Sequence, residues 1–362
     1  MLKLIHASDF HLDSPFSGLT PEWAAQRRSE QRSLLDDLAQ LVQDKGADLV
    51  LLSGDLFDSD RVYRETADAL VSALSRIPCP VFIAPGNHDY YSPASPYAAM
   101  RWPKNVHIFS TNQMEGVTLP DLNCTIWGGA FTAPHMDTSP LQGFTAPTGD
   151  GRIHLGVLHA DVEGGPDYGP ITREDMASSG LAYLALGHVH QWSGVQRAGN
   201  TRWAYSGCPE GRGFDETGEK GVLYVEVGRD STQAQFIPLA RRRYQVLSVD
   251  LTGQSDHLAA IVNALPTATA NDVYRILLTG QANSPDLGRL ERAMAPRFYG
   301  LTLRDRTHIP VQLWASRGED SLTGIFLQLM WEKCQAEPDN ISLQQAVRFG
   351  LAALEQGEDP YL

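Results

Sequence analysis

The most constraining feature of this sequence is a set of five short apolar runs, each followed by polar side chains suited to binding a cation. The runs occupy residues 2–5, 49–52, 79–83, 153–158 and 181–186. Apolar runs of this length that are bounded by turn residues predict buried strands. Ligands of open α/β sheets bind beyond the carboxyl ends of the strands. We therefore expect the five polar strand ends to converge on one point.

The residues at these strand ends are carboxylates, imidazoles and one amide. They form D-x-H at Asp9 and His11, G-D-x-x-D at Asp55 and Asp58, G-N-H-D at Asn87, His88 and Asp89, a single histidine at His159, and G-H-x-H at His188 and His190. D-x-H alone is common by chance, and Asp58 alone could cap the next turn. The ordered set is far more specific, and chance explains it poorly.

The chemistry of these side chains predicts a centre for two metal ions. The candidate ligands are Asp9, His11, Asp55, Asn87, His159, His188 and His190. Oxygen and imidazole donors without sulfur suit a hard to borderline divalent ion such as Mn, Fe or Zn. Seven ligands are too many for one tetrahedral ion, but they suit two ions that share a bridging ligand. Two ions about 3.5–4 Å apart can clamp the attacking and leaving oxygens of a phosphoryl displacement.

Composition excludes several other classes of protein. No apolar run approaches the roughly 20 residues of a membrane span, and the chain begins directly with a strand, so we expect no signal peptide. The four cysteines form no C-x-x-C pair, which argues against a thiolate zinc site or a disulfide framework and fits a reducing cytoplasm. A formal net charge of −14 argues against a surface that is basic all over. It leaves room for a local basic groove, because distant exposed charges are screened.

The order of elements predicts an α/β chain of three parts. Strands and helices alternate as β-α-β-α-β at the start, which predicts parallel strands with right-handed crossovers. We expect a first domain over residues 1–240, in which residues 203–206, 221–227 and 234–238 form antiparallel strands. A smaller β-α-β-α-β block without clustered metal-type ligands is expected over residues 241–310, followed by a helical tail over residues 311–362.

The ordered motifs resemble those of the calcineurin-like metallophosphoesterase superfamily, over roughly residues 1–239. Within it, D-F-H-L-D-S-P-F from Asp9 and G-D-L-F-D from Gly54 are similar to the DNA-repair exonuclease branch of the bacterial SbcD and YhaO type. This resemblance implies two packed mixed β-sheets flanked by helices, with a small α/β capping domain and a helical carboxyl-terminal tail. It also implies a dimeric, Mn-dependent exonuclease or endonuclease that acts on DNA and is paired with a coiled-coil, SMC-like ATPase.

The resemblance also assigns a role to each motif residue. One metal ion would be held by Asp9, His11, Asp55 and His190, and the other by Asp55, Asn87, His159 and His188, so that Asp55 bridges them. His88 resembles the family's catalytic histidine, which contacts the scissile phosphate and stabilises or protonates the leaving oxygen. Asp58 and Asp89 are expected to lie behind the ligands.

Three functions stay open from the sequence: a DNA phosphodiesterase in a repair complex, a small-molecule phosphoesterase acting on cyclic nucleotides or nucleotide-sugar lipids, and a binding scaffold with a vestigial site. The intact ligand set counts against the scaffold. The extra domain and apolar tail favour the first function over the second. The negative net charge of the chain counts mildly against DNA as the substrate, because DNA affinity depends on Lys and Arg contacts to phosphates.

Two surface features also have alternative explanations. Arg241, Arg242 and Arg243 could supply a local DNA-binding patch or form an ordinary solvated surface. In the tail, an apolar stripe with helix-in-groove spacing consists of Leu322, Ile325, Phe326 and Leu329. This stripe could bind the coiled coil of an ATPase, pack on the protein's own core or form a self-dimer.

Overall fold

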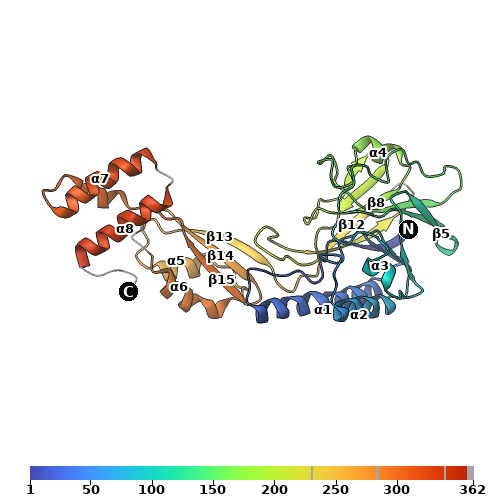
Figure 1. Ribbon diagram of the computed structural model, residues 1–362, viewed down its shortest axis with the longest axis horizontal. Helices are drawn as coiled ribbons and strands as arrows, with labels where there is room; N and C mark the ends of the chain where they lie inside the picture. The colour runs from blue at the N-terminus through green and yellow to red at the C-terminus, as the bar shows by residue number, and fades with distance from the viewer. Residues whose placement is uncertain (230, 283–284, 338–339, 357–362) are drawn as a thin grey trace. The chain divides into compact units, whose positions relative to one another are not determined.

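The computed structural model describes residues 1–229, 231–282, 285–337 and 340–356 (Figure 1). The chain forms two compact units, Met1–Arg243 and Tyr244–Leu362. The predicted capping block and helical tail therefore fall within one unit, and their separation into two domains stays a prediction. No helix in the described part of the chain is long and apolar enough to span a membrane.

The first sheet of the amino-terminal unit has six strands in the order β12-β11-β1-β2-β3-β4. Its strands are β1 (Leu2–Ala7), β2 (Leu49–Leu52), β3 (Val81–Ile83), β4 (Val106–Ile108), β11 (Gly221–Val227) and β12 (Thr232–Pro238). Strands β1 to β4 are parallel, as the alternation of strands and helices predicts for the first three, and β11 and β12 extend the sheet antiparallel beyond β1. The carboxyl ends of β1, β2 and β3 therefore lie at one edge.

The second sheet has six strands in the order β5-β6-β7-β8-β10-β9. Its strands are β5 (Glu115–Leu119), β6 (Cys124–Gly128), β7 (Ile153–His159), β8 (Tyr183–Gly187), β9 (Gln196–Ala198) and β10 (Thr201–Tyr205). The prediction that residues 203–206 pair in an antiparallel manner is wrong for one neighbour, because β10 pairs parallel with β8 and antiparallel only with β9. The short strand β9 provides the reversal that makes this parallel pairing possible.

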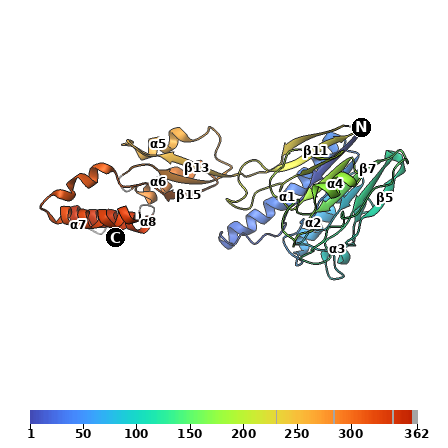
Figure 2. The same ribbon diagram turned by 90° about the horizontal axis from the view of Figure 1, so that it is seen from above.

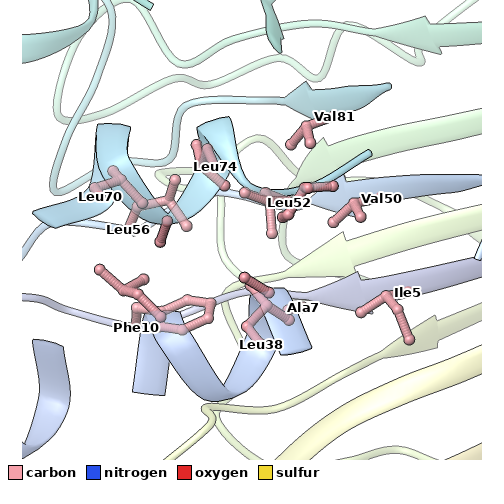
Figure 3. Close-up of a cluster of buried hydrophobic side chains, with 14 of the residues drawn as sticks. Ile5, Ala7, Phe10, Leu38, Val50, Leu52, Leu56, Leu70, Leu74 and Val81 are labelled. Atoms are coloured by element: carbon pink, nitrogen blue, oxygen red, sulfur yellow. The ribbon is translucent and has the colours of Figure 1, made fainter. Parts of the chain in front are cut away.

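The two sheets pack face to face, with helices outside them, as the resemblance implies. Side chains such as Leu51 and Phe82 of the first sheet and Val157 of the second share one buried cluster. Helices α1 (Pro21–Lys45) and α2 (Arg64–Ser75) lie side by side (Figures 1 and 2) and cover the outer face of the first sheet. Figure 3 shows this contact, where Leu38, Leu70 and Leu74 of the helices pack near Leu52 of β2. The remaining helical turns of this unit are α3 (Pro96–Ala99), η1 (Pro120–Leu122) and α4 (Arg173–Ser178).

The carboxyl-terminal unit begins with a three-stranded parallel sheet. Its elements are β13 (Tyr244–Asp250), α5 (His257–Ala264), β14 (Val273–Thr279), α6 (Leu287–Met294), η2 (Ala295–Arg297) and β15 (Gly300–Asp305). Ile261 of α5 and Leu290 of α6 share a buried cluster with alternate residues of β14, such as Ile276 and Leu278. Because alternate strand residues face the same side, both helices cover one face of the sheet.

The tail consists of η3 (Val311–Gly318), α7 (Leu322–Ala336) and α8 (Ile341–Gln356). One face of α7 packs on its neighbours, since Leu327 shares a buried cluster with Trp314 and Val347. Phe326 of the predicted stripe is partly buried in the same cluster. The other three members of the stripe face outward, with exposed fractions of 69% for Leu322, 56% for Ile325 and 58% for Leu329. The tail thus has a core of its own and an uncovered apolar face.

Candidate metal centre

The loops that follow β1 and β2 run side by side, and backbone hydrogen bonds hold them together. The amide of Asp9 donates to the carbonyl of Gly54 (3.0 Å), and the amide of His11 donates to the carbonyl of Asp55 (2.9 Å). This pairing continues the parallel register of the two strands beyond the sheet. It places the carboxylates and the imidazole of the first two motifs next to one another.

The backbone at four candidate ligands is left-handed. The φ angles are 55° for Asp9, 45° for His11, 49° for Asp55 and 112° for His188. Positive φ is uncommon for residues other than glycine, and strain of this kind concentrates at functional sites. The surrounding hydrogen bonds therefore hold these residues in conformations that their own steric preferences disfavour.

Two motif glycines let the strand ends approach closely. A Cβ atom on Gly86 would lie 2.2 Å from Oδ1 of Asp55, and one on Gly187 would lie 1.9 Å from the carbonyl oxygen of Ser53. Both distances are far below a normal contact, so a side chain at either position would push two strand ends apart. The glycines of G-N-H-D and G-H-x-H are thus explained by packing.

The first group of donor atoms comes from the loops that follow β1, β2 and β8. Nε2 of His11 and Nε2 of His190 lie 3.1 Å apart. His190 Nε2 lies 3.6 Å from Oδ1 of Asp9, and His11 Nε2 lies 3.6 Å from Oδ2 of Asp55. Bonds from a metal ion to such ligands are about 2.0–2.2 Å long, which places donors of one ion at separations of this order. These four residues therefore fit a common cation.

The second group gathers around His159. Its Nε2 lies 3.0 Å from Oδ1 of Asn87 and 3.4 Å from Oδ2 of Asp55. Asp55 consequently faces both groups, in the position expected of a bridging carboxylate. The His188 ring packs edge-on against that of His159, with centroids 5.3 Å apart, and its Nε2 lies 3.9 Å from Oδ2 of Asp161. His188 is near this group, but it is not a member of the closest carboxylate–imidazole sets among the described residues.

Electrostatics favour a cation between these groups. Asp9 and Asp55 are 0% and 2% exposed, and buried carboxylates are unfavourable unless they are paired or bind a metal. Burial, together with the charges of Asp89 and Asp9, raises the pKa of Asp55 well above its usual value. Burial also lowers the pKa of His11 to about 4, so its imidazole is neutral and able to act as a ligand. The donor set and its charge therefore fit divalent cations.

Asp89 lies behind the candidate ligands and joins two of the loops that carry them. Its Oδ2 accepts hydrogen bonds from the amides of Leu56 (2.7 Å) and Phe57 (3.1 Å) and from the Tyr97 hydroxyl (2.6 Å). Its Oδ1 accepts from the amide of Gly86 (2.8 Å). One buried carboxylate thus holds the loop of Asp55 against the loop of Asn87.

Asp58 also lies behind a ligand, and it leads to two residues that the motifs did not indicate. Its Oδ1 is 3.1 Å from Nδ1 of His11, an ion-pair distance at an angle poorly aligned for a hydrogen bond. The same oxygen accepts a hydrogen bond from Nη1 of Arg212 (2.9 Å). Oε1 of Glu216 lies 2.6 Å from Nδ1 of His190. Arg212 and Glu216 belong to an irregular loop without hydrophobic periodicity, so no pattern in the sequence indicated them.

The three arginines considered for DNA binding each form an ion pair with an acidic residue of the amino-terminal unit. The partners are Asp37 for Arg241 (2.8 Å), Glu30 for Arg242 (2.9 Å) and Glu219 for Arg243 (3.8 Å). These pairs fasten the end of the unit to α1 and to the loop before β11. A contact with DNA phosphates would have to compete with them.

Comparison with known proteins agrees with this geometry. Residues 2–192 match the model of the calcineurin-like phosphoesterase family. The chain belongs to this family. The resemblance inferred from the motifs is therefore confirmed at the level of the family, and the site described above lies mainly within the matched region.

The relatives of this chain include proteins of both types that the motifs indicated. It is 31% identical over 264 residues to "Uncharacterized metallophosphoesterase YhaO" of Bacillus subtilis (strain 168), covering 69% of this chain and 64% of that protein. It is 25% identical over 281 residues to the D component of the nuclease SbcCD of the same strain, covering 65% and 69%. It is 21% identical over 322 residues to the corresponding SbcCD component of Staphylococcus epidermidis, covering 79% and 81%. The matched region thus spans less than two thirds of YhaO.

We expect Asp89→Asn to lower the free energy of unfolding by about 1–3 kcal/mol, because the amide group presents a donor to buried donors that lose their acceptor. Tyr97→Phe is the matched control, since it removes one of the four hydrogen bonds and leaves the carboxylate in place. Chemical denaturation without added metal measures both. A wild-type stability for Asp89→Asn would show that this carboxylate does not hold the two loops together.

Proposed function

We propose that this protein is a metal-dependent phosphodiesterase that hydrolyses DNA in the cytoplasm as the nuclease subunit of a repair complex. The observation that carries the proposal is the arrangement of two donor groups around the shared carboxylate of Asp55, with the His88 ring beside them. A site of this kind serves phosphoryl transfer, in which positioning and charge stabilisation provide most of the catalysis.

The proposed ligands divide between two ions. Asp9, His11, Asp55 and His190 would hold one ion, and Asp55, Asn87, His159 and His188 the other. Oxygen and imidazole donors without sulfur suit Mn²⁺. When bound, two such cations neutralise the charge of the phosphate and activate a water molecule. Of these proposed ligands, Asp9 and Asp55 are buried.

His88 is suited to act on the leaving oxygen. Its Nδ1 lies 3.0 Å from the carbonyl oxygen of Asp58, which fixes Nδ1 as the donor and leaves Nε2 free. The ring is exposed and lies edge-on to that of His11, with centroids 4.8 Å apart. The amide of His88 donates to Oδ1 of Asp55 (3.0 Å), which holds the residue beside the bridging carboxylate. A protonated Nε2 in this place can stabilise or protonate a departing oxygen.

The choice of DNA as the substrate rests on the relatives named as parts of a nuclease and on the additional unit at residues 244–362. The deciding experiment incubates the purified protein with Mn²⁺ and labelled single- and double-stranded DNA, beside a phosphodiester dye ester. DNA cleavage supports the proposal. Hydrolysis of the dye ester without DNA cleavage would favour a small-molecule phosphoesterase, and no hydrolysis of either would favour a binding scaffold.

We expect His88→Ala to keep both metal ions and to lose turnover, because the ring belongs to neither of the two proposed ligand sets, although it forms a third group of possible donors with His11 and Asp58. General acid catalysis contributes about 10²–10⁴-fold, which is the loss expected in hydrolysis of DNA. Metal analysis and steady-state kinetics measure the two effects. His308→Ala, which changes an exposed histidine of the other unit, serves as the control on the dye ester. A depleted metal site in His88→Ala would contradict this role.

We expect Asp55→Ala to abolish the binding of both ions and the activity, since one carboxylate faces both donor groups. Calorimetric titration of the metal-free variant with Mn²⁺ measures the binding. Loss of one ion with about half of the activity retained would show that Asp55 does not bridge the two sites.

We also propose that the protein works as a homodimer and binds a coiled-coil, SMC-like ATPase through the exposed face of α7. A helix presents its anchors to a groove at i, i+3, i+4 and i+7, and Leu322, Ile325 and Leu329 follow this spacing on the solvent side. The buried side of α7 stabilises the tail itself, so removal of the whole tail would test folding and binding together.

A single charge on the exposed face separates these effects. We expect Ile325→Asp to abolish co-purification with a co-expressed coiled-coil ATPase and to leave dye-ester hydrolysis and the melting temperature unchanged. Gln345→Asp adds the same charge at an exposed position of α8 and is the matched control. Unchanged co-purification of Ile325→Asp would contradict this binding face.

A further inference from the structure

A single guanidinium group joins the two carboxylates that lie behind the first group of donor atoms. Nη1 of Arg212 donates to Oδ1 of Asp58 (2.9 Å), and its Nη2 donates to Oε1 of Glu216 (2.6 Å). The Arg212 amide also donates to Oε2 of Glu216 (2.7 Å). Arg212 and Glu216 come from the loop between β10 and β11, whereas Asp58 follows β2.

Each of these carboxylates faces the outer nitrogen of one imidazole. Oδ1 of Asp58 lies 3.1 Å from Nδ1 of His11, and Oε1 of Glu216 lies 2.6 Å from Nδ1 of His190. Nη2 of Arg212 lies 3.2 Å from the same Nδ1. Because the carboxylate oxygen of Glu216 is nearer, we place a hydrogen on Nδ1 of His190 that donates to Glu216. The inner nitrogen of His190 then remains as a lone-pair donor, and it lies 3.1 Å from the inner nitrogen of His11.

The second group of donor atoms is supported differently. Nδ1 of His159 lies 2.9 Å from the carbonyl oxygen of Ser53, which is a neutral backbone acceptor. The described contacts of Arg212, Asp58 and Glu216 include none with Asn87, His159 or His188. The charged network therefore supports the imidazoles of one predicted ion and not those of the other.

We infer that Arg212 is a positioning residue that acts through Asp58 and Glu216 to set the cation affinity of the site formed by His11 and His190. Carboxylates behind a metal-bound histidine fix its tautomer and increase its basicity, and their loss costs about 10–100-fold in metal affinity. Arg212 balances the charge of both carboxylates, and it holds Glu216 at 2.6 Å from Nδ1 of His190 and Asp58 at 3.1 Å from Nδ1 of His11. The inference rests on the proposed two-ion centre and adds a residue that controls one half of it.

Arginine is required here because its planar fork donates in two directions at once. Lysine carries the same charge on a single nitrogen without this geometry. Arg212→Lys should therefore recover only part of what Arg212→Met loses. Glu216→Gln keeps the shape of the side chain and removes the charge behind His190 alone, so its effect should be smaller than that of Arg212→Met.

The experiment titrates the metal-free, full-length protein with Mn²⁺ by calorimetry and follows no activity. The wild type is expected to show two binding steps. Arg212→Met should weaken one step by about 10–100-fold and leave the other unchanged. The same substitution in an Asn87→Ala background identifies the affected step, because Asn87→Ala impairs the other site. Arg32→Met, which removes an arginine paired with Glu65 at 2.9 Å, is the matched control.

Each outcome supports or overturns the inference. Equal weakening of both steps would show that Arg212 only stabilises the fold, and unchanged steps would show that it has no effect on the cation. If Arg212→Met does not fold, Arg212→Lys and Glu216→Gln decide by the same measurement. A wild type that binds no Mn²⁺ would overturn the two-ion centre and the inference together. Two wild-type steps without hydrolysis of DNA would overturn the proposed function alone.

Discussion

The structure of the site depends on the burial of two carboxylates, Asp9 and Asp55, at the point where the strand ends of both sheets meet. Charges that are removed from water need a compensating charge nearby. The described surroundings supply imidazoles whose inner nitrogens face the same carboxylates at 3.4–3.6 Å, which is too far for a strong hydrogen bond. Cations between these donors would satisfy the carboxylates and the imidazoles together. The need for that charge explains why polar side chains are concentrated at an otherwise apolar junction.

Interactions within the fold itself hold this arrangement in place. Left-handed backbone at Asp9, His11 and Asp55 is unfavourable by itself, so other interactions must hold it. Backbone hydrogen bonds between the first two loops and the four hydrogen bonds of Asp89 do so. Gly86 and Gly187 allow the loops to approach. Ligands that are already positioned lose little conformational entropy when a cation binds.

The sequence predicted the parts of the molecule whose determinants are local. Apolar runs, turn glycines and strand-end motifs lie within a few residues of one another, and they indicated the strands, the two outer helices and the donor set. Pairing between distant segments was harder to predict from the sequence, as the parallel pairing of β10 with β8 shows. The same reason applies to Arg241, for which the sequence left a DNA-binding patch and a solvated surface open, because its partner Asp37 lies far away in the sequence. Glu216 was missed because an irregular loop has no period that could indicate which way its side chains face.

The candidate ligands and the groups that orient them come from different parts of the chain. The ligands come from short motifs that are fixed by the ends of strands. The groups behind His11 and His190 come partly from the loop that contains Arg212 and Glu216. This loop contains no strand or helix. A change in the charge of Arg212 or Glu216 would alter the basicity of His11 and His190 while the motifs stay the same. The positioning role that we propose for Arg212 would therefore give proteins with identical motifs a physical route to different metal requirements.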